Sequence, residues 1–140
     1  MSGMVRWSRF LFNVVAWIFV GCVAIQVYLA GLGVFGTGGF GLHSLFAAFG
    51  LLAILMLILA MVGRAPRWVI GSTALIFGLF VLQSVFVAMR ESTPAVAALH
   101  PVNGFLIGLV SVVVAWRTRD WLRPPKSAPA DQTTAETKGA

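Results

Sequence analysis

The sequence predicts an all-α membrane protein, a bundle of four transmembrane helices built from two similar helical hairpins. Of its 140 residues, 59% are hydrophobic and only 10% are charged, whereas a soluble domain carries roughly 25% charged residues. The mean hydropathy is +0.95. The apolar residues form four runs, each long enough to cross a bilayer. These observations together place the chain in lipid.

The four runs are separated by short polar or glycine-rich segments. Pro66 stops helix continuation before the third span. Thr93 and Pro94 are a typical N-cap and first helical residue for the fourth. Pro101 lies within the fourth span, where a proline kinks a helix. The predicted spans cover residues 10–30, 41–62, 68–89 and 94–116, within a transmembrane domain of residues 10–118 that follows an N-terminal segment, residues 1–9.

The C-terminal segment, residues 119–140, is rich in Ala, Pro, Thr and charged residues and has no apolar period. We expect it to be a disordered tail, because such a composition cannot bury enough apolar surface to fold.

The basic residues predict the orientation of the chain. Nine of the ten Lys and Arg residues lie in the N-terminal segment, in the turn after the second span, or from Arg117 at the end of the fourth span onward, and only Arg90 lies in another turn. Because loops rich in Lys and Arg remain cytoplasmic, we expect both termini in the cytoplasm of a bacterial inner membrane. The cations lie at the ends of spans and not on one face of a soluble fold, which argues against nucleic acid as a partner.

The only two histidines, His43 and His100, lie near the starts of the second and fourth spans. Gln26 precedes His43 by 17 residues, and Gln83 precedes His100 by 17 residues. The two hairpins therefore repeat at an offset of 57. With both termini inside, all four polar side chains lie at one level near the outer face. Polar groups in lipid are costly and usually face the bundle interior, so we expect a polar site there.

This pattern favours a b-type haem held by His43 and His100 as the two metal ligands. A haem needs two neutral imidazoles from opposite walls of a pocket, and the two hairpins supply one each. Gln26 and Gln83 are candidates to orient the ligands, and Arg90 to meet the propionates. Two histidines without a nearby Cys, Asp or Glu make a poor zinc or copper site. Four small residues at helical spacing from the histidines are expected to leave a slot for the ring: Ala47, Gly50, Gly104 and Gly108.

The chain resembles one four-helix half of haem A synthase over roughly residues 8–118. Gln26 to Phe35 look like the end of that family's first helix. His43 and Leu99-His100 look like its haem ligands. It implies haem binding by His43 and His100. It does not extend to the oxygenase activity, because Phe40 stands where the catalytic half has a carboxylate. The chain also resembles small bacterial four-helix membrane proteins of a family of unknown function, which carry Leu-His-Pro at the start of the fourth helix.

Three functions compete at this point. The first is a haem protein for electron transfer or haem handling, with a redox partner; this reading does not require an enzyme, because both axial positions are filled. The second is a haem-free structural or assembly subunit of a larger membrane complex. The third, ranked last, is a carrier of small molecules or a quinone-binding protein that uses the four polar side chains. A second copy of the chain is a further candidate partner.

Overall fold

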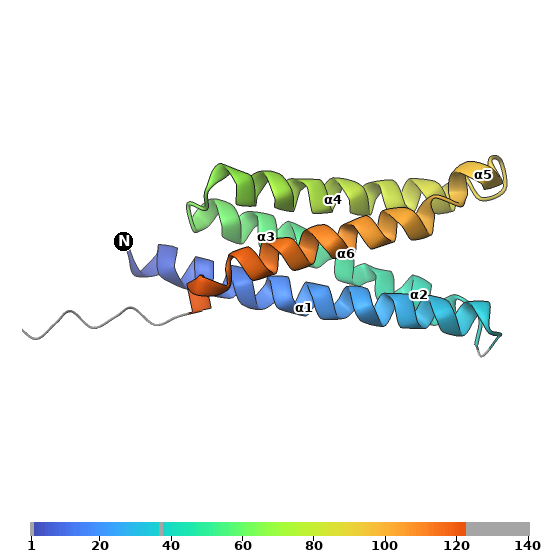
Figure 1. The fold of residues 1–140 in the computed structure, drawn as a ribbon, viewed down its shortest axis with the longest axis horizontal. Coiled ribbons are helices and arrows are strands. Elements are labelled where there is room, and N and C mark those ends of the chain that lie inside the picture. The colour runs from blue at the N-terminus through green and yellow to red at the C-terminus, as the bar shows by residue number, and fades with distance from the viewer. Residues whose placement is uncertain (1, 37, 123–140) are drawn as a thin grey trace, which may run out of the picture.

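Four apolar helices of membrane-spanning length make up the protein in the computed structural model, which describes residues 2–36 and 38–122 (Figure 1). They run Gly3–Val34, Gly41–Val62, Arg67–Ala88 and Pro94–Arg117. The prediction of an all-helical membrane protein with four spans is confirmed, and its natural surroundings are a lipid bilayer. The helical elements are α1 (Gly3–Val34), α2 (Gly41–Phe46), η1 (Ala47–Gly50), α3 (Leu51–Val62), α4 (Arg67–Ala88), α5 (Pro94–Ala97), α6 (His100–Arg117) and η2 (Arg119–Leu122).

The first helix is longer than the predicted span of residues 10–30. It starts at Gly3 and includes most of the basic N-terminal segment and the first four residues of the glycine-rich segment 31–41. The turn itself is made by Gly36, Gly38 and Gly39, which adopt φ values of 77°, 156° and 64°. Such positive φ angles carry no steric penalty for glycine, so the chain reverses there within a few residues.

The second and fourth spans are interrupted near their N-terminal ends, where the two histidines lie. In the second span, the 3-10 turn η1 separates α2 from α3. In the fourth span, α5 ends at Ala97 and α6 begins at His100, so a break replaces the predicted kink. Pro101 lies in the first turn of α6. A proline there needs no N–H for the helix ladder, but it cannot donate to the carbonyl of residue 97.

The core lies toward the end of the bundle that holds the start of α1 and η2 (Figure 1). Helices α1 and α4 each pack against α3 and α6. Trp121 of η2 packs edge-on against Phe12, with ring centres 5.5 Å apart. Residues 119–122 therefore belong to the folded bundle and not to the predicted tail, because Trp121 finds an apolar partner; residues 123–140 lie outside the described residues. The buried cluster contains Phe12, Ala16, Phe19, Ala53, Met56, Ala60, Ala65, Val69, Ile76, Ile107, Val114 and Ala115.

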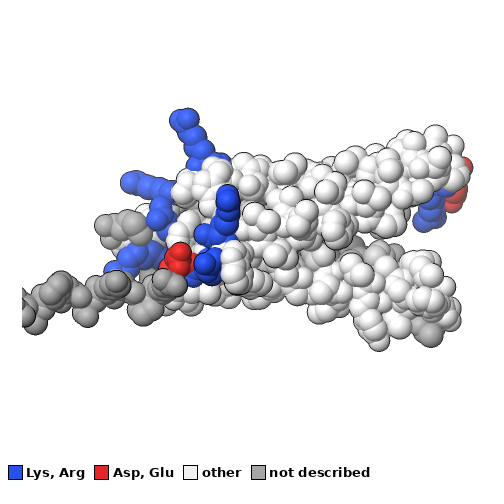
Figure 2. Space-filling model, in the orientation of Figure 1, with Lys and Arg blue, Asp and Glu red and all other residues white. Residues whose placement is uncertain are grey.

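The two ends of the bundle differ in charge and in packing. Basic side chains gather at the end where the N-terminus lies, and the opposite end is divided into two lobes (Figure 2). One lobe holds α2 and the end of α1, and the other holds α5 and the ends of α4 and α6 (Figure 1). No residue of α2 or α5 is buried. The hairpins therefore separate at the end that carries both histidines.

Candidate functional site

A cavity of about 530 Å³ lies between the two hairpins, near the end where the lobes separate. Its volume falls within the range of about 300–1,000 Å³ that small-molecule and cofactor sites occupy. Most of its wall is apolar, including Val23, Val27, Phe49, Phe80 and Phe105. The polar side chains that line it are Gln26, His43, Ser44, Gln83, Ser84 and His100.

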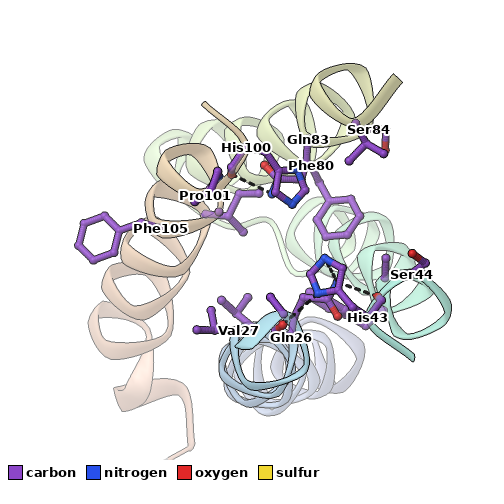
Figure 3. Close-up of a pocket in the computed structure, with 17 residues that line it drawn as sticks. Gln26, Val27, His43, Ser44, Phe80, Gln83, Ser84, His100, Pro101 and Phe105 are labelled. Carbon is purple, nitrogen blue, oxygen red and sulfur yellow. Dashed lines mark hydrogen bonds between the residues drawn. The ribbon is translucent and has the colours of Figure 1, made fainter. Parts of the chain in front are cut away.

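The imidazole rings of His43 and His100 lie opposite one another across this cavity (Figure 3). Their centres are 6.1 Å apart, and their planes are inclined by 60°. His43 is the third residue of α2, and His100 is the first residue of α6. The structure therefore brings together the two residues that sequence analysis selected as a ligand pair, one from each hairpin.

Gln26 of α1 holds both the backbone and the ring of His43. Its side-chain amide donates to the backbone carbonyl of His43 at 2.9 Å. Nδ1 of His43 lies 3.1 Å from the backbone carbonyl of Gln26. A carbonyl can only accept, so Nδ1 carries the ring proton and Nε2 is left with a lone pair. The Gln26 amide nitrogen lies 3.3 Å from that Nε2.

Gln83 of α4 holds the backbone of His100 but not its ring. Its amide donates to the backbone carbonyl of His100 at 3.0 Å, which is the counterpart of the Gln26 bond in the first hairpin. Asn103 in turn donates to the side-chain oxygen of Gln83 and, at 2.8 Å, to the backbone carbonyl of Leu79. Nδ1 of His100 is buried and has no hydrogen-bond partner in the structure. The ring of His100 thus lacks the close contact that Nδ1 of His43 makes with the Gln26 carbonyl.

An aromatic cluster closes the inner end of the cavity. Phe49 contacts Phe19, Phe46 and Phe80, with ring centres between 5.2 and 5.5 Å apart. The ring of Phe80 lies directly against the backbone of Gly50, in the space that a Cβ would need. This cluster limits how far any ligand can penetrate between the helices.

The expected slot beside the histidines exists only in part. Ala47 and Gly104 line the cavity. Gly50 and Gly108 do not, because Phe80 fills the space at Gly50 and Val23 lies against Gly108. The small residues one turn away from each histidine therefore form the cavity wall, and those two turns away serve helix packing instead.

Arg90 is placed outside the cavity. Its side chain is 70% exposed and lies 3.4 Å from the carboxylate of Glu91, in the turn between α4 and α5. Ser44 and Ser84, which sequence analysis did not select, are the additional polar side chains at the cavity. Asn103 was also missed, although an asparagine one turn after His100 in an apolar span was a visible signal, since such residues are rare in lipid.

Comparison with known proteins adds one relationship. No curated protein and no solved structure matches the chain. Nothing in these comparisons connects the chain to haem A synthase. Residues 26–89 match a protein family; the stretch begins at Gln26, includes His43 and Gln83, and ends before His100. Over these residues the chain is similar to the family described as "Family of unknown function (DUF6220)".

Proposed function

We propose that this membrane protein holds one b-type haem between its two hairpins, with His43 and His100 as the axial ligands, and serves electron transfer or haem handling. The observation that carries the proposal is the placement of two imidazoles 6.1 Å apart across a largely apolar cavity of about 530 Å³. Ionisable side chains within membrane spans are costly and usually mark a functional site, and here two of them line one cavity.

The separation of the rings fits ligation of one metal ion. Metal–nitrogen bonds in proteins are about 2 Å long, so one metal ion would require the two ring nitrogens to approach within about twice that length. The observed separation of the ring centres is 6.1 Å. The 60° angle between the rings is compatible with this, because rotation of a ring about its metal–nitrogen bond leaves the bond intact.

The hydrogen bonds of His43 fit the same role. A ligating histidine usually donates its second ring N–H to a backbone carbonyl or a carboxylate, which fixes the tautomer and the ring orientation. Nδ1 of His43 makes this contact with the carbonyl of Gln26, at 3.1 Å. For Nε2 to bind a metal, the Gln26 amide nitrogen has to leave its 3.3 Å contact with Nε2 while it keeps its bond to the His43 carbonyl.

A haem held in this way supplies a one-electron redox centre, with a potential set by its ligands and surroundings. The chain's own residues bind and orient it. His43 and His100 supply the ligand nitrogens, Gln26 and Gln83 position their backbones, and Phe80 closes the inner end of the cavity. Ser44 and Ser84 are the cavity's additional donors for the polar edge of a ligand. The side chain of Arg90 is too exposed to be the main donor to the propionates.

The location that we propose follows from charge. Basic side chains of the described residues gather at one end of the bundle, with Arg90 as the exception (Figure 2), and the histidines belong to α2 and to the start of α6, toward the other end (Figure 1). Loops rich in Lys and Arg stay in the cytoplasm. Both termini are then cytoplasmic in a bacterial inner membrane, and the haem lies near the outer face. There it exchanges electrons with a partner protein on that side.

A reduced-minus-oxidised visible spectrum of protein purified in detergent from haem-supplemented cells tests this function. Wild type should show sharp low-spin bands, and His43→Ala and His100→Ala should each lose them. Ser92→Ala, an exposed change in the turn between α4 and α5 and away from the cavity lining, is the control and should keep the bands. A folded, colourless wild type would contradict haem binding and would favour the haem-free assembly subunit.

A further inference from the structure

The two histidines differ in how their rings are held. His43 has a hydrogen bond from Nδ1 to the Gln26 carbonyl and a contact from Nε2 to the Gln26 amide. It also packs edge-on against Phe40, with ring centres 6.2 Å apart. His100 has none of these contacts: only its backbone carbonyl is bonded, and its buried Nδ1 has no partner.

The backbone around the two rings differs as well. His43 lies inside α2, which is followed without a gap by η1 and α3. His100 is the first residue of α6 and directly follows the break at Ala98 and Leu99. His100 therefore follows a break in its span, whereas His43 lies within continuous helical turns.

These differences bear on ligand strength. A hydrogen bond to the second ring nitrogen raises the basicity of a ligating imidazole and holds its orientation, and removal of such a partner typically costs 10–100-fold in metal affinity. His43 has such a partner and His100 does not. The site, if it holds haem as proposed above, therefore has one strong and one weak axial ligand.

We propose that His100 is an exchangeable ligand, and that a small uncharged molecule takes its place at the metal while His43 retains the haem. In this exchange one bond to the His100 nitrogen breaks and one bond to the incoming molecule forms, with no change in oxidation state. The inference rests on the proposed haem function. It adds a ligand-binding role, for molecules of the size of carbon monoxide or free imidazole, to an otherwise closed electron-transfer site.

The cavity is open to such molecules from the side. Phe105 and Val27 line it, yet they are 71% and 65% exposed. They come from α6 and α1 and lie on the same side of the cavity in Figure 3. An uncharged molecule dissolved in the bilayer can reach the space between the histidines along this side without crossing the aromatic cluster. No charged side chain of the described residues lines the cavity, so a small charged molecule would gain no ion pair beside the histidines.

The test uses haem-loaded, full-length protein in detergent. Reduced wild type is exposed to carbon monoxide, and its absorption spectrum is recorded. Haem loss to an excess of a haem-free acceptor protein is then measured for wild type, His43→Ala, His100→Ala and the exposed control Ser92→Ala, with circular dichroism as the check of folding. His100→Gln provides a second variant if the alanine change prevents folding.

We expect carbon monoxide to shift the wild-type spectrum. His100→Ala should keep its haem in a high-spin form, and free imidazole should return it to low spin. His43→Ala should lose haem at least about tenfold faster than His100→Ala does. Equal haem loss from the two variants, the reverse order, or a wild-type spectrum that carbon monoxide leaves unchanged would overturn the inference and leave the haem proposal standing. Colourless wild type would overturn both.

Discussion

Nδ1 of His43 donates a hydrogen bond to the backbone carbonyl of Gln26, 3.1 Å away, so that the ring is held by the same residue whose side chain binds its backbone. The link joins α1 to α2 across the glycine-rich turn. It makes Gln26 the residue on which the orientation of His43 depends. The predictions below test this link, the network around His100 and the packing that shapes the cavity.

Gln26→Leu should weaken haem binding about tenfold, because it removes the amide that fixes the backbone of His43 while it keeps the side-chain volume. Gln83→Leu should have a smaller effect, since Gln83 touches only the backbone of His100. Titration of haem into purified apoprotein measures both affinities. Equal affinities for the two variants and wild type would show that neither glutamine positions a ligand.

Asn103→Ala should destabilise the bundle by about 1–2 kcal/mol, the range of interhelical hydrogen bonds in model membrane helices. Asn103 is only 4% exposed, and it ties α6 to α4 through Leu79 and Gln83. The free energy of unfolding in mixed micelles with sodium dodecyl sulfate provides the measurement. Ser92→Ala, an exposed change in the turn between α4 and α5, serves as control and should leave stability unchanged.

Gly50→Ala should destabilise by about 1–3 kcal/mol, as overpacking does in a tight core, because a Cβ at Gly50 would meet the ring of Phe80. Adding Phe80→Leu should recover part of the loss, since it shortens the obstructing side chain. Gly21→Ala is the matched control: it has nothing within 4 Å, and it should be neutral or slightly stabilising. Thermal unfolding followed by circular dichroism compares the four proteins. If Gly50→Ala unfolds at the wild-type temperature, the ring of Phe80 can move aside without loss of stability, and the prediction is wrong.

Arg9→Lys should cost about 1–2 kcal/mol, because an ammonium group cannot reproduce the forked contacts of a guanidinium. Arg9 donates to the carbonyls of Gly63 and Arg64, at 2.8 and 2.9 Å, and its guanidinium lies 5.2 Å from the ring centre of Trp121. It thereby joins the start of α1 to the α3–α4 turn and to η2. Arg6→Lys, at an exposed position, should be neutral in the same unfolding assay.

Orientation can be tested by cysteine labelling. In a Cys22→Ser background, Ser92→Cys lies in the turn next to Arg90, and Ser2→Cys lies at the start of α1, both at exposed positions. A maleimide that cannot cross membranes should label Ser92→Cys in intact cells and Ser2→Cys only after lysis, because basic loops stay in the cytoplasm. Labelling of Ser2→Cys in intact cells would invert the proposed topology.

The sequence by itself determined the features that depend on local composition. Four long apolar runs are four spans because lipid acts as the solvent, so the length of a helix follows from the residues within it. The pairing of His43 with His100 was likewise predictable, because each has a glutamine 17 residues before it and polar residues in a span turn toward the interior.

Only the tertiary structure decided what lies beside each histidine. That Gln26 holds the ring of His43 while the ring of His100 stays unbonded depends on the rotation and crossing of helices, which no spacing reveals. The same holds for Phe80, whose ring fills the space at Gly50 and closes the expected slot. The side chain of Arg90 lies outside the cavity, and η2 packs against α1 through Trp121. Contacts between distant segments, and not local composition, set both positions.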